Sequence, residues 1–124
     1  MTDSNALAAL EERVIELGRR MARLEDTHAV KCLQYKYGYY IDKCLYDEAV
    51  ALFADTGEVR FLNGVYRGKS GIRRLYCNWF RKYFTGGVNG PLRGLLLDHL
   101  MLQDIVDVAT DGLRLEPVRL IDHL

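Results

Sequence analysis

The sequence predicts an α+β fold in which helices come first and an antiparallel sheet follows. Apolar residues recur at helical spacing up to about residue 54. Alternating residues with an Asn-Gly turn come next, and a long apolar run fills residues 92–109. Because strand patterns follow a block of helices instead of alternating with them, a parallel doubly wound sheet is disfavoured. A chain of 124 residues is expected to form one domain, 1–124.

The first predicted element is a helix within residues 1–24, for which Ser4 could serve as N-cap. Its apolar residues fall on the a and d positions of three heptads, and most other positions are charged: Leu7, Leu10, Val14, Leu17, Met21 and Leu24. Such a stripe either packs on its own domain or pairs with a second subunit. The pattern leaves both interpretations open.

A second helix is expected after a new N-cap at Asp26 or Thr27. Its apolar stripe consists of Val30, Leu33, Tyr37, Tyr40, Ile41 and Cys44. Asp47 could cap a short third helix over residues 48–54. These three helices are expected to cover one face of the sheet.

Residues 57–61 alternate as a strand does, and Asn63-Gly64 is a tight-turn signal. A helix capped by Ser70 follows, and its apolar face consists of Ile72, Leu75, Tyr76, Trp79, Phe80 and Tyr83. Four basic residues lie outside that face: Arg73, Arg74, Arg81 and Lys82. They are expected to form a solvated helix face, and the alternative is a basic patch that binds phosphates.

The predicted long strand 92–109 leads into a turn at 110–112 and a last strand at 113–121. Strand alternation places His99 on one face, together with Leu95, Leu97 and Met101. Asp98 falls on the opposite face, together with Leu96, Leu100 and Leu102. Because both faces are apolar, helices are expected to cover one, and a cavity or a partner subunit the other.

The composition excludes several classes of protein. Seventeen basic residues balance 17 acidic ones, which disfavours nucleic-acid or anionic-membrane partners. No apolar run is long enough to cross a membrane, and the acidic, helix-patterned N-terminus does not resemble a signal peptide. The three cysteines form no close pair, which predicts reduced thiols and a cytoplasmic protein.

Two stretches carry a family resemblance: "YGYYIDKCLYDEAVALFADTGEVRFLNGVYRGKSGIRRLY" and "LLLDHLMLQDIVDVATDG". In them a helix ends in Asp, an aromatic-Asp pair opens the next helix, "LFAD" leads into a strand, and a His lies in a long strand before an acidic turn. This pattern resembles the SnoaL-like and scytalone-dehydratase-like members of the nuclear transport factor 2-like superfamily. The resemblance covers about residues 24–112, so 25–112 is expected to be the core of the fold and 113–124 a short terminal strand.

The resemblance implies a cone-shaped, curved antiparallel sheet wrapped around the helices, with a pocket at its open end. Relatives include cofactor-free dehydratases and isomerases that act on ring compounds. Asp42 and His99 match the acid–base pair of the dehydratase pattern, whereas Ile41 and Phe61 stand where that pattern has tyrosines. The family continues through further strands, one of which carries a second His. After His99 this chain has one further histidine, His123, and one predicted strand, which Pro117 interrupts. The sheet is therefore expected to be incomplete at its C-terminus.

Proton transfer beside a carbonyl requires a base and a hydrogen-bond donor for the developing enolate oxygen. We therefore expect His99 to be the general base or acid, Asp42 to orient it, and Tyr39 or Tyr40 to bind an oxygen. Five of the eight tyrosines lie between Tyr35 and Tyr46, which suits a wet pocket or an interface. The candidate substrate-binding residues are Tyr39, Tyr40, Tyr46, Phe61, Trp79 and Met101.

The predicted function is that of a lyase or isomerase for a small hydrophobic, ring-bearing substrate. It is expected to need no cofactor and no metal, and to act as a homodimer or higher homo-oligomer. The alternative is a non-catalytic ligand-binding or dimerisation module, or a truncated inactive relative.

One feature opposes the acid–base pair: on an ideal helical wheel, Asp42 falls almost opposite the stripe of Leu33 and Tyr37. It would reach His99 only if that second face is also buried, or if the helix bends after Gly38.

Overall fold

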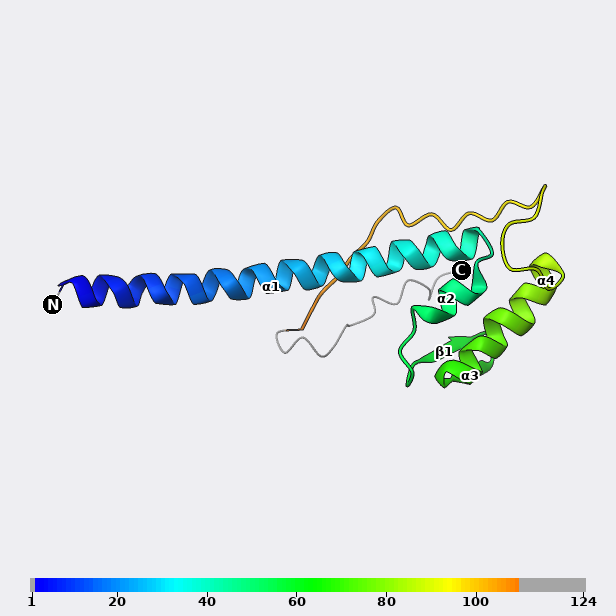
Figure 1. Ribbon diagram of the computed structural model, residues 1–124, viewed down its shortest axis with the longest axis horizontal. Helices are drawn as coiled ribbons and strands as arrows, with labels where there is room; N and C mark the ends of the chain where they lie inside the picture. Colours follow the sequence, from blue (N-terminus) through cyan, green and yellow to red (C-terminus); the bar gives the residue numbers. More distant parts are fainter. Residues whose placement is uncertain (1, 110–124) are drawn as a thin grey trace. The chain divides into compact units, whose positions relative to one another are not determined.

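The computed structural model describes residues 2–109 (Figure 1). They form two compact units, one of residues 2–32 with 103–109 and one of residues 33–102, and each is described by itself. The predicted turn at 110–112, the last strand, Pro117 and His123 lie outside the described residues. The elements are α1 Thr2–Asp42, α2 Tyr46–Ala51, β1 Glu58–Phe61, β2 Gly64–Arg67, α3 Gly68–Arg73, η1 Arg74–Phe80 and α4 Arg81–Thr85.

Helix α1 is a single helix, so the predicted break near residue 25 is wrong (Figure 1). Ser4 lies inside the helix and not at its cap. The Thr27 hydroxyl donates a hydrogen bond of 2.9 Å to the Arg23 carbonyl one turn earlier, as threonine does within a helix and not at its start. Capping residues mark possible helix starts, but by themselves they do not end the helix that precedes them.

Helix α1 ends in a Schellman motif. The Leu45 N–H donates to the Tyr40 carbonyl at 2.8 Å, and the Cys44 N–H donates to the Ile41 carbonyl at 3.0 Å. Cys44 takes the left-handed conformation of this motif, with φ of 55°, where glycine is the usual residue. Its side chain is buried in the core, which supplies a reason for a residue larger than glycine at this position. The motif fixes Asp42 as the last residue of the helix.

The hydrophobic core lies in the unit of residues 33–102. Its fully buried side chains come from the α1–α2 turn, α2, α3 and η1: Cys44, Tyr46, Val50, Ile72, Leu75 and Tyr76. Tyr37 packs on this cluster from α1, and its hydroxyl lies 2.7 Å from that of Tyr76. Burial raises the pKa of both tyrosines, so the two hydroxyls stay neutral and share one hydrogen bond.

The predicted hairpin is confirmed. Strands β1 and β2 pair antiparallel, with Glu58 opposite Arg67 and Phe61 opposite Gly64. Leu62 enters the intervening turn with φ of 52°. The Glu58 carboxylate accepts hydrogen bonds of 2.8 Å from Arg67 across the hairpin and from Arg60 on its own strand. Those two contacts hold the pKa of Glu58 below its usual range.

A continuous helical stretch, α3–η1–α4, replaces the single regular helix predicted after Ser70. It begins at Gly68, and no side chain caps its start. The middle segment η1 is π-helical, and its wider turn advances the buried face by about one residue. Phe80 and Phe84 therefore pack against the core, whereas Trp79 and Tyr83 are exposed, contrary to the prediction.

Arg93 and Gly94 lie in a turn closed by a 3.1 Å hydrogen bond from the Leu95 N–H to the Leu92 carbonyl. Residues 95–107 form no strand ladder within the described chain, so the predicted long strand is wrong for this segment. The predicted alternation nevertheless holds. Leu95 and Leu97 pack against the core, whereas Leu96, Leu100 and Leu102 are exposed. The segment thus has one apolar side on the core and a second apolar side exposed. This is the side-chain pattern of a β-strand, but the backbone hydrogen bonds of a sheet are absent from the described segment.

Candidate functional site

Asp42 and His99 meet although 57 residues separate them in the sequence. One Asp42 carboxylate oxygen, Oδ1, lies 2.6 Å from His99 Nδ1 and accepts a second hydrogen bond, of 2.8 Å, from the His99 backbone N–H. The two contacts fix both the imidazole and the backbone that carries it. The Asp42 side chain is 20% exposed and that of His99 is 53% exposed, so the carboxylate is sheltered and the imidazole is open to solvent.

Gly38 explains how an extended segment reaches this face of α1. It is the buried glycine of the helix, and a Cβ atom there would lie 3.3 Å from the Met101 side chain and 3.8 Å from the His99 carbonyl. Asp42 is one turn beyond Gly38 on the same face. The missing side chain lets the segment approach, and the next turn receives the imidazole. The extended segment therefore covers α1 at Gly38 and Asp42, and Asp42 reaches His99 although Tyr39 on the same side of the helix stays exposed.

The pair has a defined protonation pattern. A carboxylate accepts but does not donate, so an ionised Asp42 assigns the hydrogen of a neutral imidazole to Nδ1. The other nitrogen, Nε2, is then the unprotonated one. Among the described residues no side chain hydrogen-bonds to it, and the imidazole is half exposed. Chemically, this arrangement can accept a proton at Nε2 and stabilise the resulting imidazolium through Asp42.

The predicted oxygen-binding tyrosines lie close to Asp42 in sequence, in the last turns of α1. The ring of Tyr39 packs edge-on against that of Tyr40, with centroids 6.2 Å apart, and Tyr39 is exposed. Among the described residues, no hydrogen bond joins the hydroxyl of Tyr39 or Tyr40 to Asp42 or His99. Met101 lies against Gly38 and is the predicted binding residue that the structure brings next to the pair.

Three further predicted binding residues lie elsewhere in the same unit. Tyr46 is 1% exposed and packs on Phe80, and Phe61 also packs edge-on against Phe80. Their rings are thus used in packing. Trp79 is exposed and lines an open surface groove together with Arg74, Asn78 and Lys82. The structure does not bring these three residues to His99.

The sequence matches a protein family described as "SnoaL-like domain" over residues 22–116. The match covers more than half of the chain. The chain belongs to the SnoaL-like family. Membership assigns it the α+β fold of the nuclear transport factor 2-like superfamily, of which the described residues contain the long first helix and a two-stranded antiparallel sheet. No curated protein matches the sequence of this SnoaL-like chain.

Within residues 2–109 no helix combines the length and the apolar character that crossing a membrane requires. The same residues contain no group of three His, Cys, Asp or Glu side chains placed to hold a metal ion.

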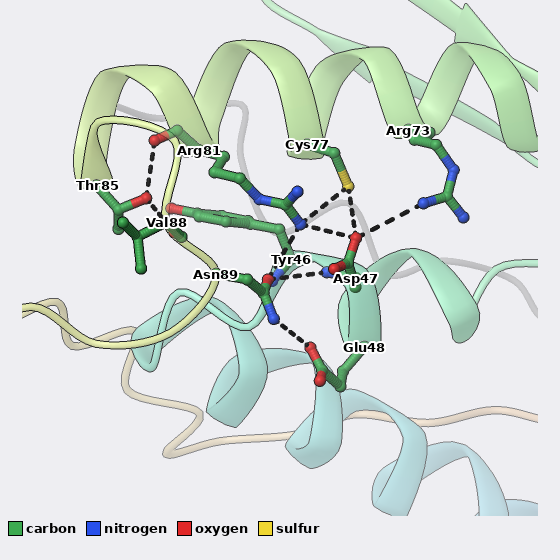
Figure 2. A network of polar contacts seen from close by, with 9 residues as sticks. All are labelled: Tyr46, Asp47, Glu48, Arg73, Cys77, Arg81, Thr85, Val88 and Asn89. Atoms are coloured by element: carbon green, nitrogen blue, oxygen red, sulfur yellow. Dashed lines mark hydrogen bonds and ion pairs between the residues drawn. The ribbon is translucent and has the colours of Figure 1, made fainter.

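A second polar cluster of the SnoaL-like chain was not predicted (Figure 2). Asn89, from the loop after α4, accepts hydrogen bonds from the Tyr46 and Asp47 backbone N–H groups and so caps α2 in place of Asp47. The Arg81 guanidinium contacts the Asn89 side chain at 3.1 Å and Asp47 at 2.7 Å. Arg81, expected to be solvated, is only 17% exposed in its side chain. Asn89 lies 42 residues from Asp47 in the sequence, so no local pattern could indicate that it caps α2.

The same cluster sets the charge state of its members. The hydrogen bond from Arg81 is the main reason that the pKa of Asp47 is lowered, and a contact from the Cys77 thiol adds to it. The pKa of Cys77 is raised, first by burial and then by its hydrogen bond to Asp47. Asp47 therefore stays ionised and Cys77 stays a thiol at neutral pH. The cluster is a fixed arrangement of charges that joins α2, η1, α4 and the loop beyond.

Proposed function

We propose that this SnoaL-like protein is a cofactor-independent lyase or isomerase that moves a proton on a small, ring-bearing, hydrophobic substrate. The proposal is supported by one observation above the others, the 2.6 Å hydrogen bond between Asp42 and His99 Nδ1. That bond leaves Nε2 of a half-exposed imidazole as the base. Members of the superfamily are often isomerases or dehydratases, which agrees with this chemistry.

In the proposed reaction, Nε2 of His99 removes a proton from the carbon beside a substrate carbonyl. Asp42 keeps the imidazole in the reactive tautomer and stabilises the imidazolium that forms. In an isomerase, His99 returns the proton to a different carbon. In a dehydratase, it gives the proton to the departing hydroxyl, and water leaves. The hydroxyl of Tyr39 or Tyr40 donates a hydrogen bond to the enolate oxygen that develops meanwhile.

The proposed ligand is apolar because the exposed imidazole is carried by a leucine-rich segment, whose Met101 side chain lies against Gly38, one turn before Asp42. We propose that the chain acts as a homodimer or higher homo-oligomer. The exposed leucines of that segment, Leu96, Leu100 and Leu102, support a partner chain at this face. The three free thiols support a reducing, cytoplasmic setting.

A second candidate is a non-catalytic module that binds a ligand or a partner through the same fold. It is favoured by the positions of Tyr46 and Phe61, whose rings pack on Phe80 and do not line a site beside His99. On this candidate, the Asp42–His99 hydrogen bond is structural and ties the extended segment to α1.

The test is a proton-transfer assay on small cyclic ketones and β-hydroxy ketones. It measures two reactions, the exchange of the α-proton for deuterium and the elimination of water. We expect turnover by the wild-type chain and a loss of about 10²-fold or more in His99→Ala and Asp42→Asn. Asp98→Asn is the matched control, because Asp98 adjoins His99 on the exposed face of the segment and should be dispensable.

Full activity in both His99→Ala and Asp42→Asn would exclude the proposed roles. A chain that binds these ketones without exchange or elimination would instead support the non-catalytic candidate. Circular dichroism and thermal unfolding of each variant separate a lost catalyst from a lost fold.

A further inference from the structure

The heptad stripe of α1 is uncovered in the described chain. Its six apolar side chains are between 55% and 70% exposed: Leu7, Leu10, Val14, Leu17, Met21 and Leu24. Single exposed apolar residues are ordinary, but six in one continuous line on a helix are not. A Cβ atom on Gly18, in the middle of this region, would meet no atom within 4 Å. The stripe therefore needs an occupant.

The described contacts of its own chain leave the stripe free. Asp107 pairs with Arg23 at 3.5 Å and Asp104 pairs with Lys31 at 3.4 Å. Arg23 is at a c position, outside the a and d positions of the stripe and the e and g positions that flank it. The stripe also ends where these contacts begin, since the next a and d positions are His28 and Lys31. Residues 7–24 are thus a separate apolar surface, with a polar boundary at its C-terminal end.

The apolar residues of the stripe favour a coiled coil of two strands. Every d position is leucine, and the central a position is the β-branched Val14. In parallel coiled coils, leucine at d with a β-branched residue at a favours two strands over three or four. A second copy of the same helix supplies matching residues at every layer, as a symmetric dimer requires.

The charged residues that flank the stripe indicate which helix pairs with it and in which orientation. Both charged e positions are acidic, Glu11 and Glu25, and both charged g positions are basic, Arg13 and Arg20. In a parallel pair each g residue faces the e residue five positions later on the other helix, so Arg20 faces Glu25 twice. An antiparallel pair sets e against e and g against g, which brings like charges together. Two copies are therefore complementary in the parallel direction.

We propose that residues 7–24 of two copies of this chain form a parallel, two-stranded coiled coil. The interface gives a specific surface to the proposed homo-oligomer and rests on that part of the proposed function. It is independent of the proton transfer at His99. Its weak point is Gly18, an e position opposite Arg13, where the helix loses both propensity and an ion pair.

The first experiment compares two exposed apolar residues of α1 in the full chain. Leu17 is 59% exposed at a d position, and Ile15 is 56% exposed at a b position, outside the stripe. We expect Leu17→Lys to weaken dimerisation by roughly a hundredfold or more, as measured by sedimentation equilibrium, and Ile15→Lys to leave it unchanged. Circular dichroism should show that both variants keep the folded unit of residues 33–102.

The second experiment tests direction at Gly18. Relative to Gly18→Gln, we expect Gly18→Glu to tighten the dimer about threefold at low salt, because two Arg13–Glu pairs form. Gly18→Arg should weaken it by a similar factor through repulsion from Arg13. The reverse order would establish an antiparallel pair and overturn the proposed direction.

A wild-type chain that is monomeric at every concentration would overturn both the coiled coil and the proposed homo-oligomer. A dimer that survives Leu17→Lys unchanged would overturn the coiled coil alone, and would direct attention to the exposed leucines of residues 96–102.

Discussion

Asp42 and Asp47 lie five residues apart, on either side of the turn between α1 and α2, and their surroundings differ in kind. Asp47 faces two guanidinium groups, Arg81 at 2.7 Å and Arg73 at 3.6 Å, which stay charged at all accessible pH values. Asp42 faces one imidazole, on an extended segment that forms no ladder in the described chain. The difference separates a carboxylate held by permanent cations from the one that we propose assists proton transfer.

The largest expected effect comes from making the same change at both sites. Asp42→Asn removes the negative charge that stabilises the imidazolium in the proposed reaction, and we expect turnover to fall about 10²-fold or more with the fold intact. Asp47→Asn should leave turnover within about twofold, because none of its described contacts involves His99. Steady-state kinetics of the two variants on one substrate measure the contrast. Equal losses at both sites would remove the distinction between them.

The next effect is on stability, and here the larger change is expected at the Asp47 site instead of the Asp42 site. Arg81→Met removes the cation that joins Asp47 to Asn89, and we expect the free energy of unfolding to fall by roughly 1–2 kcal/mol. Arg73→Met is the matched control. Its side chain is 57% exposed and contacts the same carboxylate at 3.6 Å, so the loss should stay below about 0.5 kcal/mol. Urea unfolding measures both, and equal losses would mean that the sheltered position of Arg81 has no energetic consequence.

The pH dependence of stability gives a smaller effect with a definite sign. The pKa of Asp47 is lowered in the folded chain, so its contribution is fully present above the ordinary pKa of an aspartate and is lost as the pH falls through the lowered value. Because the carboxylate is 50% exposed, solvent screening keeps this contribution below about 1 kcal/mol. The stability difference between wild type and Asp47→Asn should therefore shrink on acidification below about pH 4. A difference that grows on acidification would contradict the assignment.

The sequence predicted the parts of this protein that depend on local pattern. The α+β class, the hairpin and the alternation that separates His99 from Asp98 all follow from spacing that neighbouring residues set among themselves. The turn of the hairpin lies at Leu62 and Asn63, one residue before the predicted Asn63-Gly64. The resemblance to the family supplied Asp42 and His99 together, which no local pattern could pair across 57 residues.

The errors have equally physical causes. The π-helical segment η1 moved Trp79 to the exterior, because a wheel drawn with α-helical spacing places every later residue one position early. The cap of α2 was misassigned because Asn89, far along the chain, accepts hydrogen bonds from the first N–H groups of that helix. The predicted strand 92–109 has the side-chain alternation of a strand, but a ladder also needs a neighbour, which side-chain pattern does not specify.

The smallest expected effect distinguishes two glycines of the same helix, and it bears on how the Asp42–His99 pair is assembled. A Cβ atom on Gly18 would meet nothing within 4 Å, so Gly18→Ala should gain the helix propensity of alanine, about 0.5–1 kcal/mol. A Cβ atom on Gly38 would lie 3.3 Å from the Met101 side chain, so the same gain is offset by crowding.

We therefore expect Gly38→Ala to change the free energy of unfolding by less than about 0.5 kcal/mol while it lowers turnover severalfold, because the segment that carries His99 must move away from α1. Thermal unfolding and kinetics of the two alanine variants, measured side by side, test this. If Gly38→Ala were as stabilising as Gly18→Ala and fully active, the segment would not depend on the missing side chain. The close approach at Gly38 would then be a consequence of the Asp42–His99 hydrogen bond and not its cause.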